Sequence, residues 1–222
     1  MTSIVKKQIV AITGVTLAGF VLVHMAGNFT IFGGPEAFNG YSETLHHLGE
    51  LLWIARIGLL AAVVIHILLT ISLVWENRAA RAGSYAVAGG KSDDLGYARR
   101  SMIYTGLLVI LFVIFHLWDF TFPAKEGPAT LIPGIEDRSL GLYGLVWNSF
   151  LDPVRAALYI AMMVLVGLHL SHGIQSLCQT LGLRNAKYTI LIDRISVAFG
   201  TVIAIGFSLV PIYINIVRIP SL

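Results

Sequence analysis

The feature that most constrains this chain is a set of five long stretches that are almost free of charge. They cover residues 8–32, 51–76, 101–122, 154–181 and 195–217, and the last contains no charged residue. About 20 apolar residues in a helix span the hydrocarbon core of a bilayer. The stretches are continuous rather than alternating, and they are too long for the ~10-residue strands of a membrane barrel, which favours helices. We therefore predict a single all-α domain, residues 1–222, built as an integral membrane bundle of five transmembrane helices.

The composition agrees with a chain that has lipid as its solvent. Hydrophobic residues make up 56% of the sequence and charged residues 12%, whereas a soluble domain carries about 25% charged residues. Polar groups are too few to cover a water-soluble globule, so a soluble enzyme and a nucleic-acid-binding protein are both excluded. The single cysteine, Cys178, excludes an internal disulfide and a cysteine-based metal cluster.

The distribution of lysine and arginine predicts which way the helices face. The N-terminus and the connections 77–100 and 182–194 are basic, whereas the connections 33–50 and 123–153 contain only Lys125 and Arg138. The basic positions are Lys6, Lys7, Arg78, Arg81, Lys91, Arg99, Arg100, Arg184, Lys187 and Arg194. Cytoplasmic connections are enriched in these residues. We predict a cytoplasmic N-terminus, an external C-terminus, flexible chain over 77–100 and tryptophan anchors near the helix ends, at Trp53, Trp75, Trp118 and Trp147.

Histidines at membrane depth are the strongest indication of function. Four of the five spans contain at least one, and these residues are His24, His66, His116, His169 and His172. Ionisable residues inside a bilayer are costly, and for this reason they mark functional sites. Neutral imidazole is a strong iron ligand, and the core of a helical bundle suits a haem. The pattern therefore predicts haem ligation, with hydrogen-bonded packing as the alternative for any single histidine.

Helical rise sorts the histidines into two layers. His24 lies 16 residues past Gln8 and His116 lies 15 residues past Ser101, which places both ~22–24 Å from the cytoplasmic ends. His66 and His169 lie 11 and 12 residues before the cytoplasmic ends of their own spans, at ~16–18 Å. We call His24 and His116 the outer pair, and His66 and His169 the inner pair. Each pair could hold one haem through two histidine ligands, which favours electron transfer over oxygen chemistry.

His172 is the alternative to His169 as the inner ligand. The two residues are three apart on nearly the same helix face. His169 matches the depth of His66 better, and Gly173, one turn further on, would let a flat macrocycle approach the helix. His172 would then contact a haem propionate or support the ligand.

Several runs resemble the single-subunit, five-helix, dihaem class of succinate dehydrogenase and fumarate reductase cytochrome b subunits. They include His169-Leu-Ser-His-Gly in the fourth span, His24-Met-Ala-Gly-Asn-Phe in the first, Phe38-Asn-Gly-Tyr41 after it, and Phe115-His116-Leu117 in the third. The resemblance covers essentially the whole chain. It implies the haem ligands His24, His66, His116 and His169, and hence two haems b.

The resemblance also implies a place in a larger complex. The chain would be the non-flavin membrane subunit of a succinate dehydrogenase or fumarate reductase in the cytoplasmic membrane of a prokaryote. It would not act on succinate by itself, because flavin and iron–sulfur chemistry belong to a flavoprotein subunit and an iron–sulfur subunit docked on the cytoplasmic side. Its electron partner in the bilayer would be a quinone, typically menaquinone.

The quinone site and the propionate contacts are less sharply defined by the sequence. A quinone site needs a proton donor or acceptor beside the ring. Candidates near the outer ends of the spans are Tyr41, Glu43, His46, His47, Glu50 and Asp119. Candidates for propionate contacts are Arg56, Arg155, Arg99 and Ser101. Solvation at the headgroup level, and for Arg56 and Arg155 snorkelling, is the alternative interpretation of these residues.

Two other functions compete with this interpretation. One is a dihaem cytochrome b anchor for a hydrogenase or a formate dehydrogenase, for which we would expect two histidines on one helix and usually four spans. The other is a haem-free proton-coupled transporter with a histidine relay. The two-layer arrangement and the lack of paired broken helices in the sequence pattern disfavour the transporter.

Overall fold

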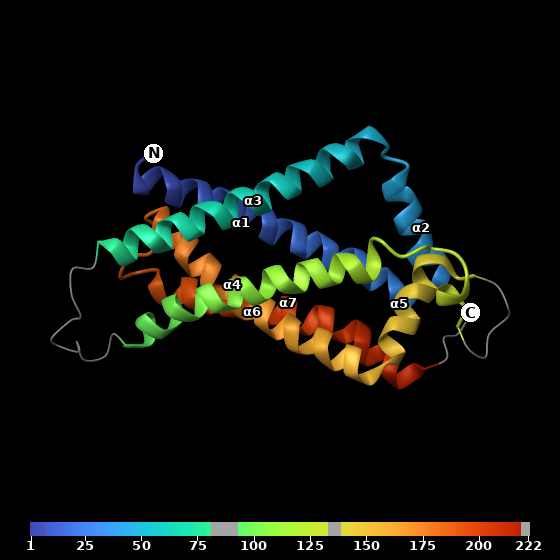
Figure 1. Ribbon diagram of the computed structural model, residues 1–222. Helices are drawn as coiled ribbons and strands as arrows, with labels where there is room; N and C mark the ends of the chain where they lie inside the picture. Colours follow the sequence, from blue (N-terminus) through green and yellow to red (C-terminus); the bar gives the residue numbers. More distant parts are fainter. Residues whose placement is uncertain (81–92, 133–138, 219–222) are drawn as a thin grey trace.

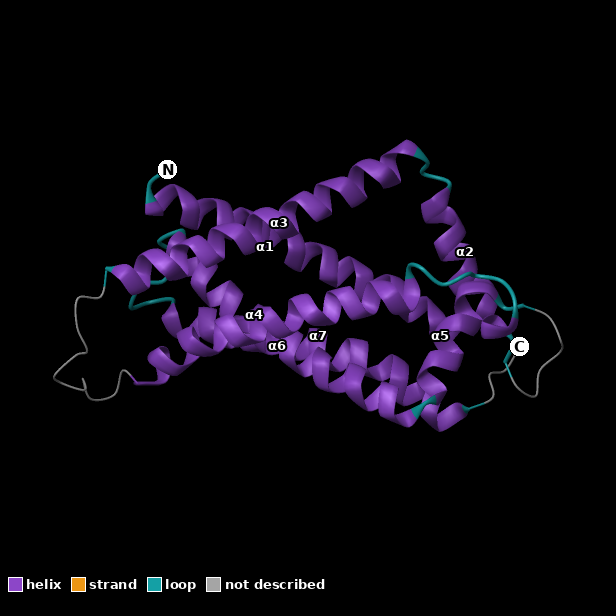
Figure 2. Cartoon of the chain, viewed as in Figure 1, coloured by secondary structure: helices purple, strands orange, loops and turns teal. Residues whose placement is uncertain are grey.

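The chain folds as an elongated bundle of helices (Figure 1). The structure is a computed structural model that describes residues 1–80, 93–132 and 139–218, with the backbone alone for 93–101. All regular structure within these ranges is helical (Figure 2). The all-α prediction holds for the part of the chain that is described.

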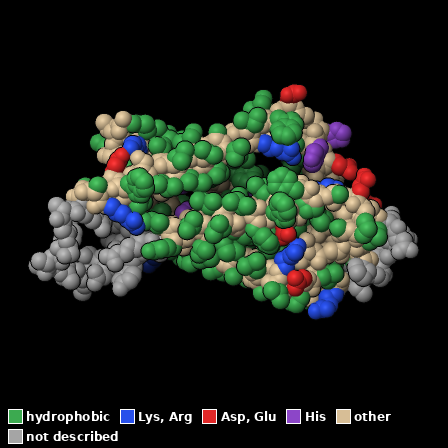
Figure 3. Space-filling model, in the orientation of Figure 1, with side chains coloured by type: hydrophobic (Ala, Val, Ile, Leu, Met, Phe, Trp, Pro, Cys, Tyr) green, Lys and Arg blue, Asp and Glu red, His purple; other side chains and the backbone are tan. Residues whose placement is uncertain are grey.

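Five helices are long and apolar enough to cross a membrane. They are α1 (Ser3–Asn28), α3 (Glu50–Ala79), α4 (Asp93–Phe120), α6 (Pro153–Thr180) and α7 (Thr189–Val217). In Figure 3 the middle of the visible face is covered by hydrophobic side chains, while charged and histidine side chains gather toward the two ends. The chain is therefore a multi-pass membrane protein by the length and surface character of its helices.

The two ends of the bundle differ in composition. The start of α1, the end of α3 and the α6–α7 connection meet at one end, which we call the basic end because Arg78, Arg184 and Lys187 lie there (Figure 1). The short helices α2 (Gly34–His46) and α5 (Gly141–Leu151) lie at the opposite end, which we call the capped end. Each end groups the connections that charge counting assigned to one side of the membrane.

The helices α2 and α5 fall where the sequence predicted only connections. Proline in its first turn starts α2, whose Phe38 is buried, and Asn39 ties α2 to α5. The Asn39 amide donates to the Leu140 carbonyl at 2.9 Å and accepts from the Tyr143 N–H at 3.1 Å. Both helices are too short to cross a bilayer, so a search for spans passes over them. Together with short 3₁₀ turns at Phe29–Gly33 and Pro128–Thr130, they close one end of the bundle.

Two further expectations need correction. Helix α4 begins at Asp93, so the segment predicted as flexible over 77–100 is helical from that residue, while 81–92 lie outside the described residues. The segment before Met102 contains Asp93, Asp94, Arg99 and Arg100, so hydropathy alone gave no sign that the helix begins earlier. Trp147 is not an interface anchor, because it is fully buried in α5. Trp53, Trp75 and Trp118 are largely exposed, as expected of anchors.

Packing is uneven around the bundle. The main hydrophobic core lies at the capped end, where Trp147, Tyr143 and Phe150 of α5 meet Ile214 of α7. Helices α6 and α7 approach so closely that a Cβ on Gly167 would lie 2.4 Å from the Gly200 carbonyl oxygen, the kind of close approach that small residues allow between membrane helices. Helix α3 packs mainly on α1, and α4 mainly on α6. These two helix pairs carry the predicted histidines.

Candidate functional site

The predicted ligands come from four different helices. His24 lies on α1, His66 on α3, His116 on α4 and His169 on α6, and each is half-buried. His24 and His116 lie near the ends of their helices at the capped end, whereas His66 and His169 lie nearer the basic end.

The structure brings the two histidines of the outer pair together. The ring centres of His24 and His116 lie 5.9 Å apart, with the ring planes at 81°. Aromatic side chains surround both rings. Phe20 and Phe207 lie within 5.7 Å of the His24 ring centre, and Phe112 and Phe120 within 5.8 Å of that of His116. The outer pair therefore lies in an aromatic, largely apolar surrounding.

One nitrogen of the outer pair has no partner among the described residues. The Nδ1 atom of His116 is buried and makes no hydrogen bond there. A buried polar atom without a partner costs free energy, so it calls for an explanation such as a ligand. Its neighbours Phe112 and Phe120 have no hydrogen-bonding side-chain atom, and the hydroxyl of Tyr159 donates to Asp119.

A partly buried ion pair lies next to His116. Asp119, one turn further along α4, accepts from Arg155 Nη1 at 3.1 Å and from the Tyr159 hydroxyl at 2.9 Å. Arg155 and Tyr159 both lie on α6, so these bonds tie α4 to α6. The Tyr159 ring centre is 6.2 Å from that of His116. Asp119 was predicted as a proton donor or acceptor, but both of its carboxylate oxygens accept hydrogen bonds here. Arg155 was predicted as a propionate contact, and its guanidinium forms an ion pair with Asp119.

The inner pair has a different surrounding, beginning with His66. Its Nδ1 lies 3.0 Å from the hydroxyl of Thr13 on α1. The next residue, Gly14, faces the same ring, and a Cβ there would lie 3.4 Å from His66 Cε1. Thr13 and Gly14 thus place a hydroxyl and bare backbone against the His66 imidazole.

His169 has the same surrounding on the other helix pair. Its Nδ1 lies 3.2 Å from the hydroxyl of Thr105 on α4. A Cβ on the next residue, Gly106, would lie 3.3 Å from His169 Cε1. The pair α4–α6 therefore repeats the arrangement of the pair α1–α3.

This repetition is visible in the sequence once the structure has shown it. Eleven residues separate Thr13 from His24, and eleven separate Thr105 from His116. Eleven residues are close to three helical turns, so each threonine shares a helix face with an outer histidine about 16 Å away. Because Thr13 and Thr105 contact the inner histidines, the two layers lie further apart than the ~6 Å expected from counting residues from the span ends, since the span ends of different helices do not lie at one level. The signal is a Thr-Gly dipeptide at a fixed distance before a histidine in two alternate spans. Reading the histidines alone missed Thr13, Gly14, Thr105 and Gly106, as it missed Tyr159.

His172, the alternative inner ligand, is half-buried on α6. Its Nδ1 is buried and makes no hydrogen bond within the described residues. It has no counterpart of the threonine–glycine contact that His169 makes. A Cβ on Gly173 would meet nothing within 4 Å, so open space lies beside the helix at that glycine.

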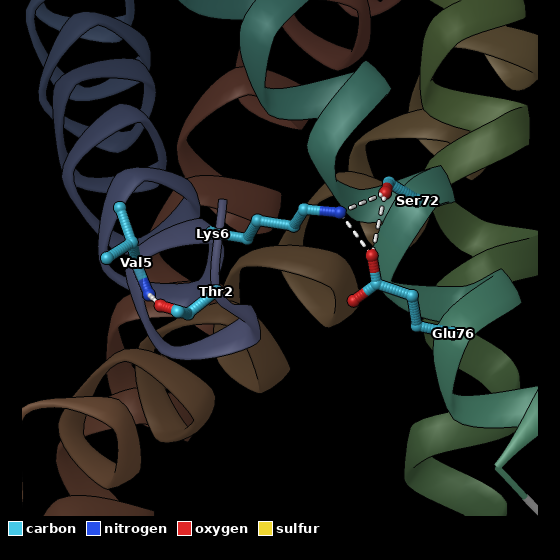
Figure 4. Close-up of polar contacts among 5 residues, drawn as sticks. All are labelled: Thr2, Val5, Lys6, Ser72 and Glu76. Carbon is cyan, nitrogen blue, oxygen red and sulfur yellow. Dashed lines mark hydrogen bonds and ion pairs between the residues drawn. The ribbon is translucent and has the colours of Figure 1, made fainter.

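A polar contact ties α1 to α3 at the basic end (Figure 4). The Lys6 ammonium on α1 donates to the Ser72 hydroxyl at 2.7 Å and forms an ion pair with Glu76, both on α3. Lys6 therefore both adds positive charge to the basic end and forms a specific ion pair with Glu76. The contact holds together the two helices that contribute Thr13 and His66.

The remaining predicted site residues lie at the capped end or outside the description. Tyr41 packs against α1, where a Cβ on Gly27 would lie 2.5 Å from its ring. Glu43, His46, His47 and Glu50 are exposed around the end of α2. Arg56 lies over the Trp53 ring at 5.2 Å. The side chains of Arg99 and Ser101 lie outside the described residues.

Electrostatics at the capped end also involve Lys125, just past α4. Its ammonium donates to the Phe120 carbonyl, so a cation meets the negative end of the α4 dipole. Partial burial lowers the pKa of Lys125. The end of α4 that carries His116 and Asp119 is thus fixed by charge as well as by packing.

Comparison with models of protein families, with curated proteins and with solved structures finds no match to this chain. Within the described residues, no three or more His, Cys, Asp or Glu side chains gather as a protein-only metal site. The candidate site therefore consists of the outer and inner histidine pairs and the side chains that contact them.

Proposed function

We propose that the chain is the membrane-anchor cytochrome b subunit of a succinate dehydrogenase or fumarate reductase complex. In this role it carries electrons between a cytoplasmic iron–sulfur and flavoprotein pair and a quinone, typically menaquinone, through two haems b. The observation that supports the proposal most is the contact of His24 and His116 across two helices, with rings 5.9 Å apart.

That separation fits a shared metal ion. Metal–imidazole bonds are roughly 2 Å long, so two imidazoles on opposite sides of one ion have ring centres about 6 Å apart. The buried, unpartnered Nδ1 of His116 adds a polar atom that lacks a protein partner among the described residues. The aromatic side chains around the pair suit the apolar edge of a porphyrin. The two histidines of the outer pair could therefore hold one haem through its iron.

The residues of this chain would have distinct roles. A haem with two histidine ligands supplies a one-electron carrier without an open coordination position. His24 and His116 would hold the outer haem, and His66 and His169 the inner one. The aromatic side chains would exclude water, and the helices would fix the two layers about 16 Å apart.

The different charge of the two ends of the bundle supports placing the soluble subunits at one end and the quinone at the other. Connections rich in lysine and arginine favour the cytoplasm, which would place the basic end there, beside the soluble subunits. The exposed residues Glu43, His46, His47 and Glu50 would then lie at the external side, near the outer pair. They are the groups available to exchange protons with a quinone, whereas Asp119 is committed to its ion pair.

The test is the haem content of the purified protein. We expect two low-spin haems b per chain in the spectrum of reduced minus oxidised protein. His24→Ala, His66→Ala, His116→Ala and His169→Ala should each remove one haem, whereas the control His46→Ala, at an exposed position on α2, should keep both. His172→Ala should also keep both if His169 is the ligand.

The same preparation separates the alternatives. Well-folded wild-type protein without haem would overturn the proposal and favour the transporter. Two haems with a hydrogenase or formate dehydrogenase as the co-purifying partner would assign the chain to that other class of anchor. Co-purification of a flavoprotein and an iron–sulfur protein with succinate–quinone activity is the expected result.

A further inference from the structure

We propose that Thr13 and Thr105 are positioning residues that fix the tautomer and orientation of His66 and His169. This inference rests on the proposed haem-binding function and adds to it the groups that would tune the inner haem. Each threonine comes from the helix that packs beside the histidine helix, and each contacts Nδ1 of the imidazole.

The direction of the hydrogen bond follows from the hydroxyl's own partners. The Thr13 hydroxyl donates to the Ile9 carbonyl at 2.9 Å, and the Thr105 hydroxyl donates to the Met102 carbonyl at 3.2 Å. A hydroxyl has one proton to donate and two lone pairs to accept with. With its proton engaged, each threonine accepts from the Nδ1–H of the histidine. Nε2 of each ring is thereby left with a free lone pair, which is the form that a metal requires.

The glycines strengthen the inference independently. A Cβ on Gly14 or Gly106 would lie 3.4 or 3.3 Å from the Cε1 atom of the facing ring. The Gly106 distance is tighter than most side-chain contacts, and the Gly14 distance is at the limit of ordinary van der Waals contact, so each ring lies directly against bare backbone. The hydroxyl and the glycine together restrict both the position and the rotation of the imidazole.

A general role in helix packing does not account for this pattern. Thr16 on α1 also donates to the carbonyl four residues earlier, at 3.1 Å, yet it is exposed and makes no hydrogen bond to a histidine among the described residues. Thr13 and Thr105 are each 8% exposed. The same dipeptide makes the same contact in both helix pairs, at the same spacing from an outer histidine. The second ring N–H of a metal-bound histidine usually donates to a carboxylate, a carbonyl or a water, which raises the basicity of the imidazole. Here the acceptors are threonine hydroxyls.

The proposal predicts the sign of a shift in reduction potential. An acceptor on Nδ1–H makes the imidazole a stronger donor and stabilises the ferric state. Thr13→Val keeps the shape of the side chain and removes the acceptor, so the midpoint potential of the inner haem should rise. We expect up to a tenfold fall in the ferric-to-ferrous ratio at a fixed potential, equivalent to ~59 mV for one electron.

The experiment is a potentiometric titration of the haem-loaded protein and of five variants. Thr13→Val and Thr105→Val should raise the same one of the two midpoints, and that midpoint should be the one missing from His66→Ala. Thr13→Ser, which retains the hydroxyl, should restore the wild-type value. Thr16→Val, on the same helix, should leave both midpoints unchanged.

The possible outcomes distinguish a failure of the positioning role from a failure of the proposed haem-binding function. Two haems with unchanged midpoints in Thr13→Val and Thr105→Val would overturn the positioning role and leave the proposed function standing. Shifts in different haems for the two variants would also overturn it, because both threonines are assigned to one pair. Wild-type protein without haem would overturn the proposed function itself.

Discussion

The inner and outer histidine pairs lie on different helices of one bundle and have opposite surroundings. Around His66 and His169, a threonine hydroxyl contacts each Nδ1 and a glycine exposes backbone to each ring. Around His24 and His116, the neighbours are phenylalanine rings and Tyr159, and the Nδ1 of His116 has no partner within the described chain. One pair is oriented by hydrogen bonds and the other by aromatic packing. Identical residue types can thus be given different electronic properties by their neighbours.

The largest effect should come from filling the space beside an inner ring. Gly106→Leu places a bulky side chain where a Cβ alone would lie 3.3 Å from His169, and overpacking of this kind displaces neighbours. We expect the loss of one haem per chain, the inner one, measured by reduced-minus-oxidised spectra. Gly19→Leu is the matched control, because nothing lies within 4 Å of a Cβ there. Loss of the outer haem instead would contradict the difference between the pairs.

The next effect should come from the ion pair that adjoins the outer pair. Asp119→Ala removes the acceptor shared by Arg155 and Tyr159 and weakens the tie between α4 and α6. Breaking a fully buried pair costs ~3–5 kcal/mol. The Arg155 side chain is 37% exposed, so solvent screening reduces our expectation to ~2 kcal/mol.

The measurement is the apparent midpoint of thermal unfolding in detergent, which should fall by about 5 °C. The spectrum of the outer haem should broaden while that of the inner haem stays unchanged. Equal changes in both spectra would show that the ion pair supports the whole bundle rather than the outer pair.

A smaller effect should follow from Tyr159→Phe. The variant keeps the ring that packs near His116 and removes only the hydroxyl bonded to Asp119, so we expect a loss of ~1 kcal/mol. Thermal unfolding should shift by about half as much as in Asp119→Ala. An unchanged unfolding midpoint would show that water or Arg155 replaces the hydroxyl at no cost.

The sequence by itself determined that the chain is a bundle of five membrane-crossing helices, and it predicted that the histidines form two layers. Hydropathy is a local property, so the five crossing helices could be found without knowledge of their neighbours, and helical rise then separated His24 and His116 from His66 and His169. The helices α2 and α5 escaped this reading because neither is long enough to span a bilayer. Trp147 was misassigned for a related reason, since its position near a predicted span end does not reveal that α5 folds over the core.

Only the tertiary structure decided which side chains meet. A helix that is apolar on all sides gives no sign of which face turns inward, so the pairing of Thr13 with His66 and of Thr105 with His169 could not be deduced from either helix alone. The same holds for Asp119, which looked available for protons until α6 placed Arg155 and Tyr159 against it. Counting residues orders positions along one membrane helix, but the level of one helix against another and the rotation of each about its axis are set by contacts between the helices.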